Sequence, residues 1–454
     1  MIKSINPATG EDIQTYPEME IEEIEKILSL TKEAQINWQK SDFGTRKKNM
    51  LQAAALLRKK NNSLSELMTA EMGKPINQSK SEIEKCAWVC EYFAENAEKF
   101  LRDEMIVSDA SKSYVTYRPL GVVLAVMPWN FPFWQVFRFA APNLMAGNAG
   151  VLKHASNVSG CALAIEEIFK DAGFPENIFR TLIISSRKVK EVIGDKNVSA
   201  VTLTGSVPAG KSVASFAGSV LKKTVMELGG SDPYLVLEDA DLERTAEICV
   251  NSRLINNGQS CIAAKRFIIV DSVYKEFKKL FTEKMKGKAV GDPAIPSIDV
   301  GPLARKDLRD ELHQQVLQSI KKGATLILGG KITEGKGAYY PPTVLANVAP
   351  GMPAYDEELF GPVAALIRVK DERSGIAAAN DTSFGLGAAV FTSDFNRGER
   401  IAKEELEAGC CFVNEFVRSD PRLPFGGVKE SGYGRELALF GIREFMNIKT
   451  VYIK

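Results

Sequence analysis

The chain has 454 residues, 45% of them hydrophobic and 25% charged, which is typical of folded globular proteins and excludes extensive disorder or a fibrous repeat. Its 58 Lys and Arg residues against 57 Asp and Glu give a net charge of +1, so no basic excess points to nucleic acid. Because no uninterrupted apolar run of about 18 residues occurs and no apolar stretch follows the first residues, we expect no membrane span, no signal peptide and a cytoplasmic chain.

Helical periodicity dominates the first hundred residues. Apolar side chains recur three and four positions apart along successive stretches, as at Ile24, Ile27 and Leu28. Gly73-Lys74-Pro75 predicts the end of a helix, since a flexible residue is followed by a ring that cannot continue it. We therefore expect several helices before the first strand of a large sheet.

From about residue 113 short apolar strands alternate with helical stretches. The first series of predicted strands is 114–117, 122–126, 151–152, 181–184, 201–203 and 225–226. A second series follows at 234–237, 267–270, 325–328, 363–368, 388–391 and 411–413, with helices predicted at 241–255, 272–286, 303–322 and 395–407. This alternation predicts two α/β domains in series, each built on a parallel sheet, with Gly229-Gly230 as the crossover.

Cysteine and histidine narrow the chemistry. The seven Cys are scattered and the two His, at 154 and 313, share no ligand pattern, so we expect reduced thiols and no metal site. Cys86 and Cys90 fall on one face of a predicted helix, and core packing is the favoured interpretation. With so few histidines, acid–base chemistry falls to a carboxylate or a thiol.

Two segments suggest a reactive thiol and a base. In Asn257-Gly258-Gln259-Ser260-Cys261 the thiol stands among glycine and small polar residues, which suits a tight turn that exposes the sulfur. A small buried hydrophobe is the alternative for Cys261. Glu227 ends an apolar strand just before two glycines, so poor solvation could raise its pKa toward the range of a general base. A carboxylate that caps a neighbouring helix is the alternative for Glu227.

Two further segments suggest an oxyanion donor and an anion site. Asn130 is an amide held in a rigid apolar turn, so it is a candidate donor to an oxyanion, although Asn is equally common as a plain turn residue. The stretch 204–210, Thr-Gly-Ser-Val-Pro-Ala-Gly, follows a strand and opens a helix, which directs N–H groups toward an anion. It lacks the dinucleotide fingerprint and is weak evidence alone.

Together these segments resemble the NAD(P)-dependent aldehyde dehydrogenases over essentially the whole chain. The matching motifs occur in the family's order and spacing, and they are Pro128-Trp129-Asn130-Phe131-Pro132, Met226-Glu227-Leu228-Gly229-Gly230, Asn257-Gly258-Gln259-Ser260-Cys261, Glu357-Glu358-Leu359-Phe360-Gly361-Pro362 and Pro424-Phe425-Gly426-Gly427. Within the family the chain looks most like the short bacterial succinate-semialdehyde dehydrogenases. A broader dehydrogenase of other short semialdehydes or aliphatic aldehydes is the alternative function.

The resemblance implies a role for each matching residue. Cys261 is expected to attack the aldehyde carbon, and Asn130 with the Cys261 backbone N–H to hold the oxyanion of the thiohemiacetal. Glu227 is expected to activate the water that hydrolyses the thioester, which argues against an enzyme that transfers the acyl group to coenzyme A. The expected cofactor positions are Trp129, Lys153, Ser156, Gly205, Ser206, Glu358 and Phe360.

Departures from the family pattern bear on cofactor and substrate. After Lys153 the chain reads His-Ala-Ser and lacks a carboxylate that relatives place against the ribose, so we expect NADP to serve as well as or better than NAD. Arg138 is the expected contact of a substrate carboxylate, with a structural ion pair as its alternative, and Ser419 with Arg418 could add to that contact. Ile255 stands where some relatives have a second Arg, and Ala263 where some have a second Cys, so we expect no redox switch there.

The resemblance also predicts the domain organisation. Residues 1–105 and 119–228 are expected to form a Rossmann-type cofactor domain, 229–436 an α/β catalytic domain, and 106–118 with 437–454 a small β oligomerisation arm. Exposed strand edges of that kind need covering, so we expect a homodimer or a homotetramer. A small-molecule aldehyde is the expected partner, with neither nucleic acid nor a membrane involved.

Overall fold

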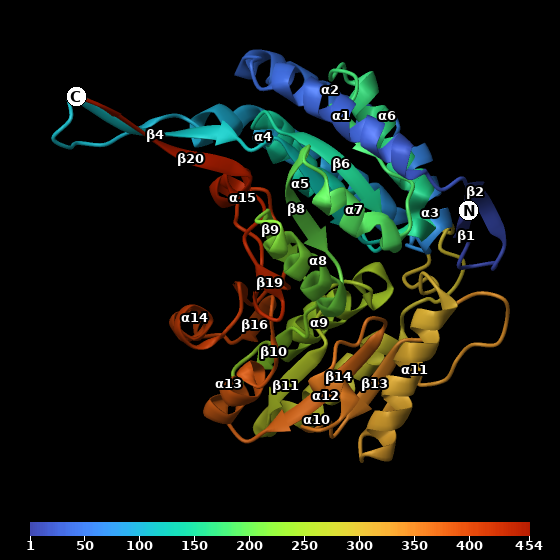
Figure 1. The fold of residues 1–454 in the computed structure, drawn as a ribbon. Helices are drawn as coiled ribbons and strands as arrows, with labels where there is room; N and C mark the ends of the chain where they lie inside the picture. The colour runs from blue at the N-terminus through green and yellow to red at the C-terminus, as the bar shows by residue number, and fades with distance from the viewer.

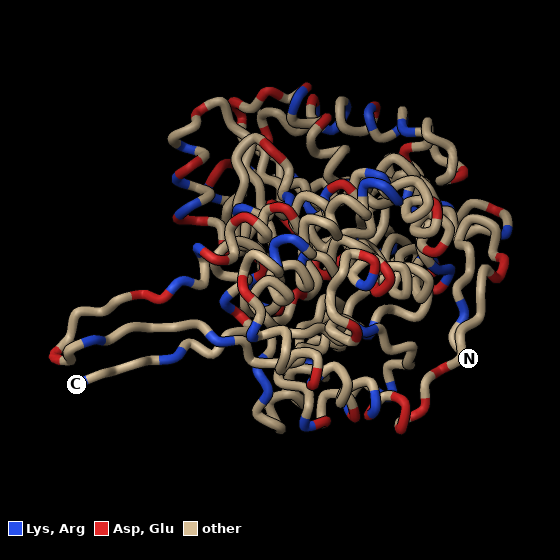
Figure 2. Tube along the Cα trace, turned by 90° about the horizontal axis from the view of Figure 1, so that it is seen from above, with Lys and Arg blue, Asp and Glu red and all other residues tan.

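The computed structural model describes all 454 residues, and its strands form two large sheets, a projecting three-stranded sheet and two separate strand pairs (Figure 1). The N-terminus lies on the main body, whereas the C-terminus lies at the tip of the projecting sheet (Figures 1 and 2). Lys and Arg are interspersed with Asp and Glu over the body in Figure 2, as the balanced net charge suggests. None of the helices is at once long and apolar enough to serve as a membrane span.

The first hundred residues form one strand pair and four helices. β1 (Ile2–Ile5) and β2 (Asp12–Tyr16) pair antiparallel and were not predicted. The helices, which were predicted, are α1 (Ile21–Trp38), α2 (Phe43–Lys59), α3 (Asn61–Met72) and α4 (Ile76–Phe100). Gly73 ends α3 in the left-handed conformation, at φ 79°, which confirms the predicted stop. Cys86 and Cys90 are fully buried on α4, so the packing interpretation is confirmed.

The first large sheet has the strand order β19-β9-β8-β5-β6-β7. Its parallel strands are β5 (Val122–Met127), β6 (Ala149–His154), β7 (Phe179–Thr181), β8 (Val198–Thr204) and β9 (Lys223–Glu227), and β19 (Gly432–Tyr433) joins antiparallel at the edge. The helices that connect them are α5 (Trp134–Met145), α6 (Ser159–Asp171), α7 (Val189–Gly194) and α8 (Val207–Ser219). The strand order reverses between β5 and β8, and ligands of such sheets bind at the carboxyl ends beside the reversal.

The strand predicted at 181–184 lies earlier in the chain than expected. β7 ends at Thr181, and Leu182, Ile183 and Ile184 continue as a buried segment outside the sheet. Burial alone explains the apolar run, because a segment packed into the core shows the same composition whether or not it pairs in a ladder.

The second large sheet has the order β12-β13-β14-β11-β10-β16-β17. Its strands are β10 (Pro233–Val236), β11 (Arg266–Val270), β12 (Thr325–Leu328), β13 (Thr343–Ala346), β14 (Val363–Val369), β16 (Gly387–Phe391) and β17 (Cys410–Val413), all parallel except β12. Its helices are α9 (Leu242–Leu254), α10 (Asp271–Lys286), α11 (Lys306–Lys321), α12 (Pro353–Asp356), α13 (Glu372–Asn380) and α14 (Phe395–Arg400), the last continued by a π-helical turn at Ile401–Glu405. β13 was not predicted.

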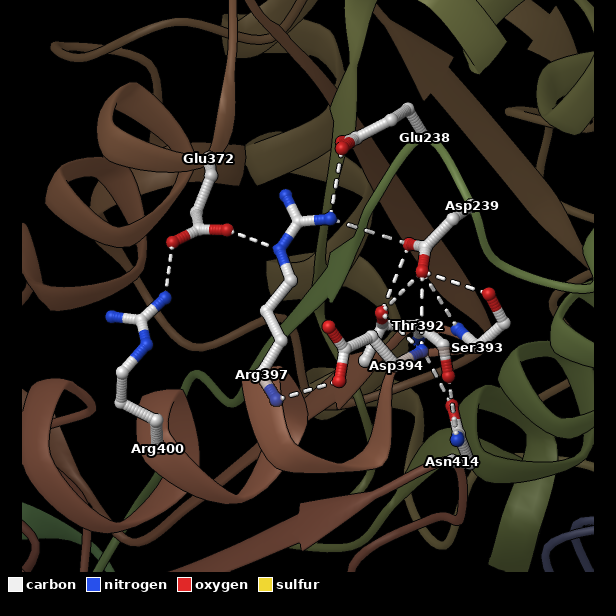
Figure 3. Close-up of polar contacts among 9 residues, drawn as sticks. All are labelled: Glu238, Asp239, Glu372, Thr392, Ser393, Asp394, Arg397, Arg400 and Asn414. Atoms are coloured by element: carbon white, nitrogen blue, oxygen red, sulfur yellow. Dashed lines mark hydrogen bonds and ion pairs between the residues drawn. The ribbon is translucent and has the colours of Figure 1, made fainter.

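A polar network closes the reversal point of this second sheet, at the carboxyl ends of β10 and β16 (Figure 3). Asp239 accepts hydrogen bonds from the Thr392 hydroxyl at 2.7 Å and the Ser393 N–H at 3.0 Å. Arg397 donates to Glu238 at 2.8 Å and pairs with Glu372. These contacts join the two loops, so this edge of the sheet is filled by the protein's own side chains.

The projecting sheet consists of β3 (Glu104–Met105), β4 (Lys112–Pro119) and β20 (Met446–Ile453). β4 and β20 pair antiparallel from Met446 opposite Pro119 to Ile453 opposite Lys112, and they extend far from the body (Figure 1). The short helix α15 (Ala438–Glu444) precedes β20. The segments 106–118 and 437–454, predicted as an arm, therefore supply most of this sheet.

Glu82 on α4 holds the start of α5. One of its carboxylate oxygens accepts the backbone N–H groups of Phe133 and Trp134, each at 2.9 Å, and the other pairs with the buried Lys74. A carboxylate at a helix N-terminus stabilises the helix through its free N–H groups. As a result α4 and α5 are tied together beside the site described next.

Candidate functional site

Cys261 follows a strained turn that only a particular sequence permits. Asn256 and Asn257 adopt left-handed backbone conformations, with φ of 51° and 58°, and Gly258 has φ of 76°. A Cβ atom on Gly258 would lie 2.3 Å from the backbone of Gly361, so glycine is required there. The Asn257 side chain locks the turn by accepting from the Gly301 N–H at 2.7 Å and donating to two backbone carbonyls. The predicted tight turn before Cys261 is thus present.

Asn130 lies against the same turn. Its Nδ2 donates to the Gln259 carbonyl at 3.0 Å, and its Oδ1 accepts from Gln135 Nε2 at 3.0 Å. The Asn256 side chain in turn donates to the Asn130 carbonyl at 2.6 Å. One N–H of the Asn130 amide is left free by these contacts, and Asn130 lines a cavity together with Cys261.

Cys261 belongs to the walls of two cavities on either side of it. One, of about 370 Å³, is lined among others by Lys85, Arg138 and Ser419. The other, of about 360 Å³, is lined by residues beside the reversal point of the first sheet. The cysteine is the point at which contents of the two cavities would meet.

The second of these cavities, called the cofactor cavity below, has features that fit a dinucleotide. Gly205 and Ser206 precede α8, whose first N–H groups receive no side-chain cap and are suited to an anion such as a pyrophosphate. Glu358 is fixed in the same wall by the Gly230 N–H at 3.0 Å, and Phe360 packs edge-on against Trp129 with ring centroids 5.7 Å apart. Five of the seven predicted cofactor residues therefore lie together here.

Lys153 and Ser156 lie outside that group. Lys153 is buried at the carboxyl end of β6, where loss of water lowers its pKa, and it forms no ion pair. Ser156 lines a small separate hollow with His154. The His154 ring supports the 128–132 turn, since Nδ1 lies 3.1 Å from the Met127 carbonyl oxygen and Nε2 lies 2.9 Å from the Pro132 carbonyl oxygen. Burial lowers the pKa of His154 to about 4, so the ring is neutral at neutral pH.

Glu227, at the carboxyl end of β9, is 2% exposed and lines neither cavity. Neither of its carboxylate oxygens has a hydrogen-bond partner. Burial and, next, the negative charge of Glu436 raise its pKa well above the usual range, while Arg138 opposes the rise. The poor solvation that the sequence suggested for Glu227 is therefore found.

The Cys261 thiol is also held neutral. Burial raises its pKa to about 12, against the opposing positive charges of Lys265 and Arg138. Lys265, which the sequence analysis did not single out, donates to the Ser260 carbonyl at 2.8 Å and lies 3.4 Å from Glu358. It connects the cysteine loop to the cofactor cavity.

In the first cavity, called the substrate cavity below, Arg138 lies on α5 and is almost fully buried. It forms an ion pair with Glu436 and donates weakly to the Thr204 hydroxyl at 3.4 Å. The sequence left open whether Arg138 forms a structural ion pair or faces the substrate. The ion pair is present, and the side chain also lines the cavity. Ser419 accepts hydrogen bonds from Lys85 and from the indole of Trp134, neither of which was predicted.

The amino-acid sequence matches the model of the Aldehyde dehydrogenase family over residues 1–451. It is 50% identical over 452 residues to a protein of Synechocystis sp. named "Probable succinate-semialdehyde dehydrogenase [NADP(+)]", covering 100% of this chain and 99% of that protein. It is 46% identical to the succinate semialdehyde dehydrogenase [NAD(P)+] of Escherichia coli, covering 99% of this chain and 97% of that one.

The fold is likewise similar to solved structures. The succinic semialdehyde dehydrogenase of Streptococcus pyogenes, crystallised with NADP+ as the cofactor, is 37% identical and superimposes with a TM-score of 0.98 over 100% of both chains. Another similar structure, of a lactaldehyde dehydrogenase from Escherichia coli, is 31% identical with a TM-score of 0.96 over 100% of this chain and 95% of that one. With the cysteine loop between its two cavities, the chain belongs to the aldehyde dehydrogenase family.

Proposed function

We propose that the protein oxidises succinate semialdehyde to succinate with NADP or NAD. The observation that carries the proposal is the position of Cys261, in the walls of both the cofactor cavity and a cavity lined with the cations Lys85 and Arg138. A four-carbon semialdehyde offers an aldehyde at one end and a carboxylate at the other. Curated relatives of this name at 46% and 50% identity over nearly the whole chain support the same substrate.

In the first half of the reaction Cys261 adds to the aldehyde carbon. The thiol loses its proton to water, the C–S bond forms, and the carbonyl oxygen becomes the oxyanion of a thiohemiacetal. The free N–H of the Asn130 amide and the backbone N–H of Cys261 donate to this oxygen. The bound dinucleotide supplies the acceptor for the hydride that leaves the same carbon, and Cys261 is left as a thioester.

In the second half Glu227 takes a proton from the water that attacks the thioester. The C–S bond breaks, succinate leaves, and the proton that Glu227 took from the water passes to the sulfur, which restores the thiol. Because poor solvation makes the ionised Glu227 carboxylate a stronger base than an exposed one, its burial suits this role. Arg138, which favours the ionised form of Glu227, also lines the substrate cavity.

The proposed cofactor contacts are Trp129, Lys153, Ser156, Gly205, Ser206, Glu358 and Phe360, with NADP used at least as well as NAD. The names of the relatives, which specify NADP(+) or NAD(P)+, support this. The unpaired cation of Lys153 is the feature that would favour a 2′-phosphate. The proposed substrate contacts, Arg138 and Ser419, lie in the other cavity.

We also propose an oligomeric state, domain limits and a cellular location for the protein. The projecting sheet exposes apolar side chains, among them Met105 at 63% and Ile448 at 62%, which supports a homodimer or a homotetramer formed through it. We keep the predicted domain limits, noting that β19 from the predicted catalytic segment pairs with β9 of the first sheet. A cytoplasmic location completes the proposal.

The test is a comparison of aldehydes with the purified protein. Succinate semialdehyde and butanal, which share a four-carbon chain but differ in the carboxylate, are each oxidised in the presence of NADP or NAD. We expect kcat/KM for succinate semialdehyde to exceed that for butanal by at least about tenfold. Cys261→Ser should abolish the reaction with both, whereas Cys411→Ser serves as the control thiol. Equal kcat/KM for the two aldehydes would favour the broader aliphatic dehydrogenase.

A further inference from the structure

Lys85 is a half-buried cation in the substrate cavity that none of the roles above uses. It lies on α4, one turn after Glu82, and shares the cavity wall with Cys261. Its ammonium nitrogen lies 4.2 Å from the centre of the Trp134 ring and donates to the Ser419 hydroxyl oxygen at 2.9 Å. It forms no ion pair, so its charge and two of its three N–H groups are available to a ligand.

The Ser419 hydroxyl group accepts two hydrogen bonds from protein groups but donates none to the protein. Its oxygen accepts one hydrogen bond from Lys85 and a second from Trp134 Nε1 at 3.1 Å. A hydroxyl oxygen has two lone pairs, so both are occupied and only the O–H hydrogen remains to be used. No protein atom accepts that hydrogen, although Ser419 is 5% exposed. An acceptor in the cavity would complete this arrangement.

Arg138 is a poorer candidate for the main contact because its charge is already matched. It pairs with Glu436 in a setting where both side chains are almost completely enclosed. A paired guanidinium attracts a further carboxylate less strongly than an unpaired ammonium does. On the cavity wall, Ile255 supplies no charge.

We infer that the ammonium of Lys85 and the hydroxyl of Ser419 bind the carboxylate of the semialdehyde, with Arg138 supporting them from behind. This inference rests on the proposed function and names the side chain that gives a charged aldehyde its advantage. The cation and the hydroxyl together offer three donors to one carboxylate, and Trp134 holds both of them in place. Binding at this end presents the other end of the substrate to Cys261.

The protonation of Lys85 should make the substrate preference depend on pH. Burial and, next, the positive charge of Arg138 lower its pKa to about 8, against the opposing charges of Cys86, Glu82 and Asp420. Only the protonated amine attracts a carboxylate. The preference for succinate semialdehyde over butanal should therefore fall as the pH rises through about 8 in the free enzyme.

The test measures that preference, as the ratio of the two kcat/KM values, in the full-length protein. Lys85→Gln and Lys85→Met should each lower the ratio at least about tenfold through KM for succinate semialdehyde, and should remove its decline above neutral pH. Lys85→Arg should restore part of the ratio. Succinate binding, measured by calorimetry, should weaken in parallel, which provides a readout independent of turnover.

Lys288→Gln is the matched control, because Lys288 lines the same cavity but is paired with Asp299 at 3.9 Å. It should change the ratio less than about twofold. An equal fall in Lys288→Gln, or an unchanged ratio and unchanged succinate binding in both Lys85 variants, would overturn the inference. A wild-type protein that does not prefer succinate semialdehyde at all would instead refute the proposed function.

Discussion

Arg138 and Glu436 form an ion pair that is almost completely enclosed, and the charges of both act on Glu227. The pair therefore connects the wall of the substrate cavity with the proposed base. Removing one member leaves the other as a buried, uncompensated charge, which is far more costly than removing both.

The first prediction concerns this pair. Arg138→Met should lower the free energy of unfolding by about 3–5 kcal/mol, and Arg138→Met combined with Glu436→Gln should recover much of that loss. Urea denaturation measures both. In the double variant a rise in KM of at least about tenfold for succinate semialdehyde but not for butanal would support direct contact of Arg138 with the carboxylate. Equal losses on both aldehydes would contradict such contact.

The second prediction concerns the Cys261 thiol. Since its pKa is raised to about 12, the reactive thiolate is a small fraction at neutral pH and should grow about tenfold per pH unit below that value. The rate at which iodoacetamide alkylates Cys261 in the free enzyme, followed by mass spectrometry, should rise accordingly from pH 7 to pH 9. A rate that levels off within this range would show that the thiol ionises at much lower pH.

The third prediction concerns the turn before the cysteine. Gly258→Ala places a methyl group 2.3 Å from the Gly361 backbone in a left-handed conformation, so we expect loss of folded protein or of all activity. Gly218→Ala is the control, because nothing lies within 4 Å of the added carbon, and it should change stability by less than about 1 kcal/mol. Soluble yield and thermal unfolding distinguish the two. A stable and active Gly258→Ala protein would show that the turn adapts.

The fourth prediction concerns His154. The pKa of His154 falls to about 4 on folding. Between pH 7 and pH 5 the residue is therefore protonated in the unfolded chain but stays neutral in the folded protein, so the free energy of unfolding decreases as the pH falls. This group should account for about 2 kcal/mol of that drop, using an unfolded pKa of about 6.5. His154→Gln should therefore lose less stability than the wild type between these two pH values in urea denaturation. An identical pH dependence would mean that the ring becomes protonated in the folded state.

The fifth prediction concerns the choice of dinucleotide. Lys153→Ala should lower kcat/KM for NADP relative to that for NAD by at least about tenfold, because the cation proposed to meet the 2′-phosphate is removed. Lys211→Ala, at an exposed position paired with Glu430, should leave the ratio of the two values unchanged. A wild-type kcat/KM for NAD tenfold or more above that for NADP would contradict the proposed preference.

Much of the fold was predictable because most helices and strands show a local pattern of apolar residues in the sequence. The period of the apolar residues predicted α1 to α4, and the alternation of short apolar runs predicted most strands of both large sheets. The largely exposed β2 has no apolar pattern that would predict a strand, and the buried β13 was missed although other strands of its length were predicted. The left-handed residues Asn256 and Asn257 match the tight turn expected from composition.

The site was predictable where a motif exists and not where a contact spans the chain. Cys261, Asn130 and Glu227 stand in recognisable motifs. Lys85 meets Ser419 across 334 positions, and no spacing rule connects them. Arg138 and Glu436 are also far apart in the sequence, and no sequence pattern predicts that they pair.

The carboxylate of Glu82, shared between Lys74 and the first turn of α5, has a consequence for redesign. Lys85 and Arg138 stand on the two helices that Glu82 joins, whereas Cys261 comes from a separate loop. Recognition of the aldehyde's far end and the bond-making chemistry are thus built on different pieces of the chain. Substitutions confined to α4 should change which aldehydes are accepted while the reaction itself stays the same, whereas a change at Arg138 on α5 also alters the charge that acts on Glu227. The helix α4 is therefore the element on which new specificities can be built.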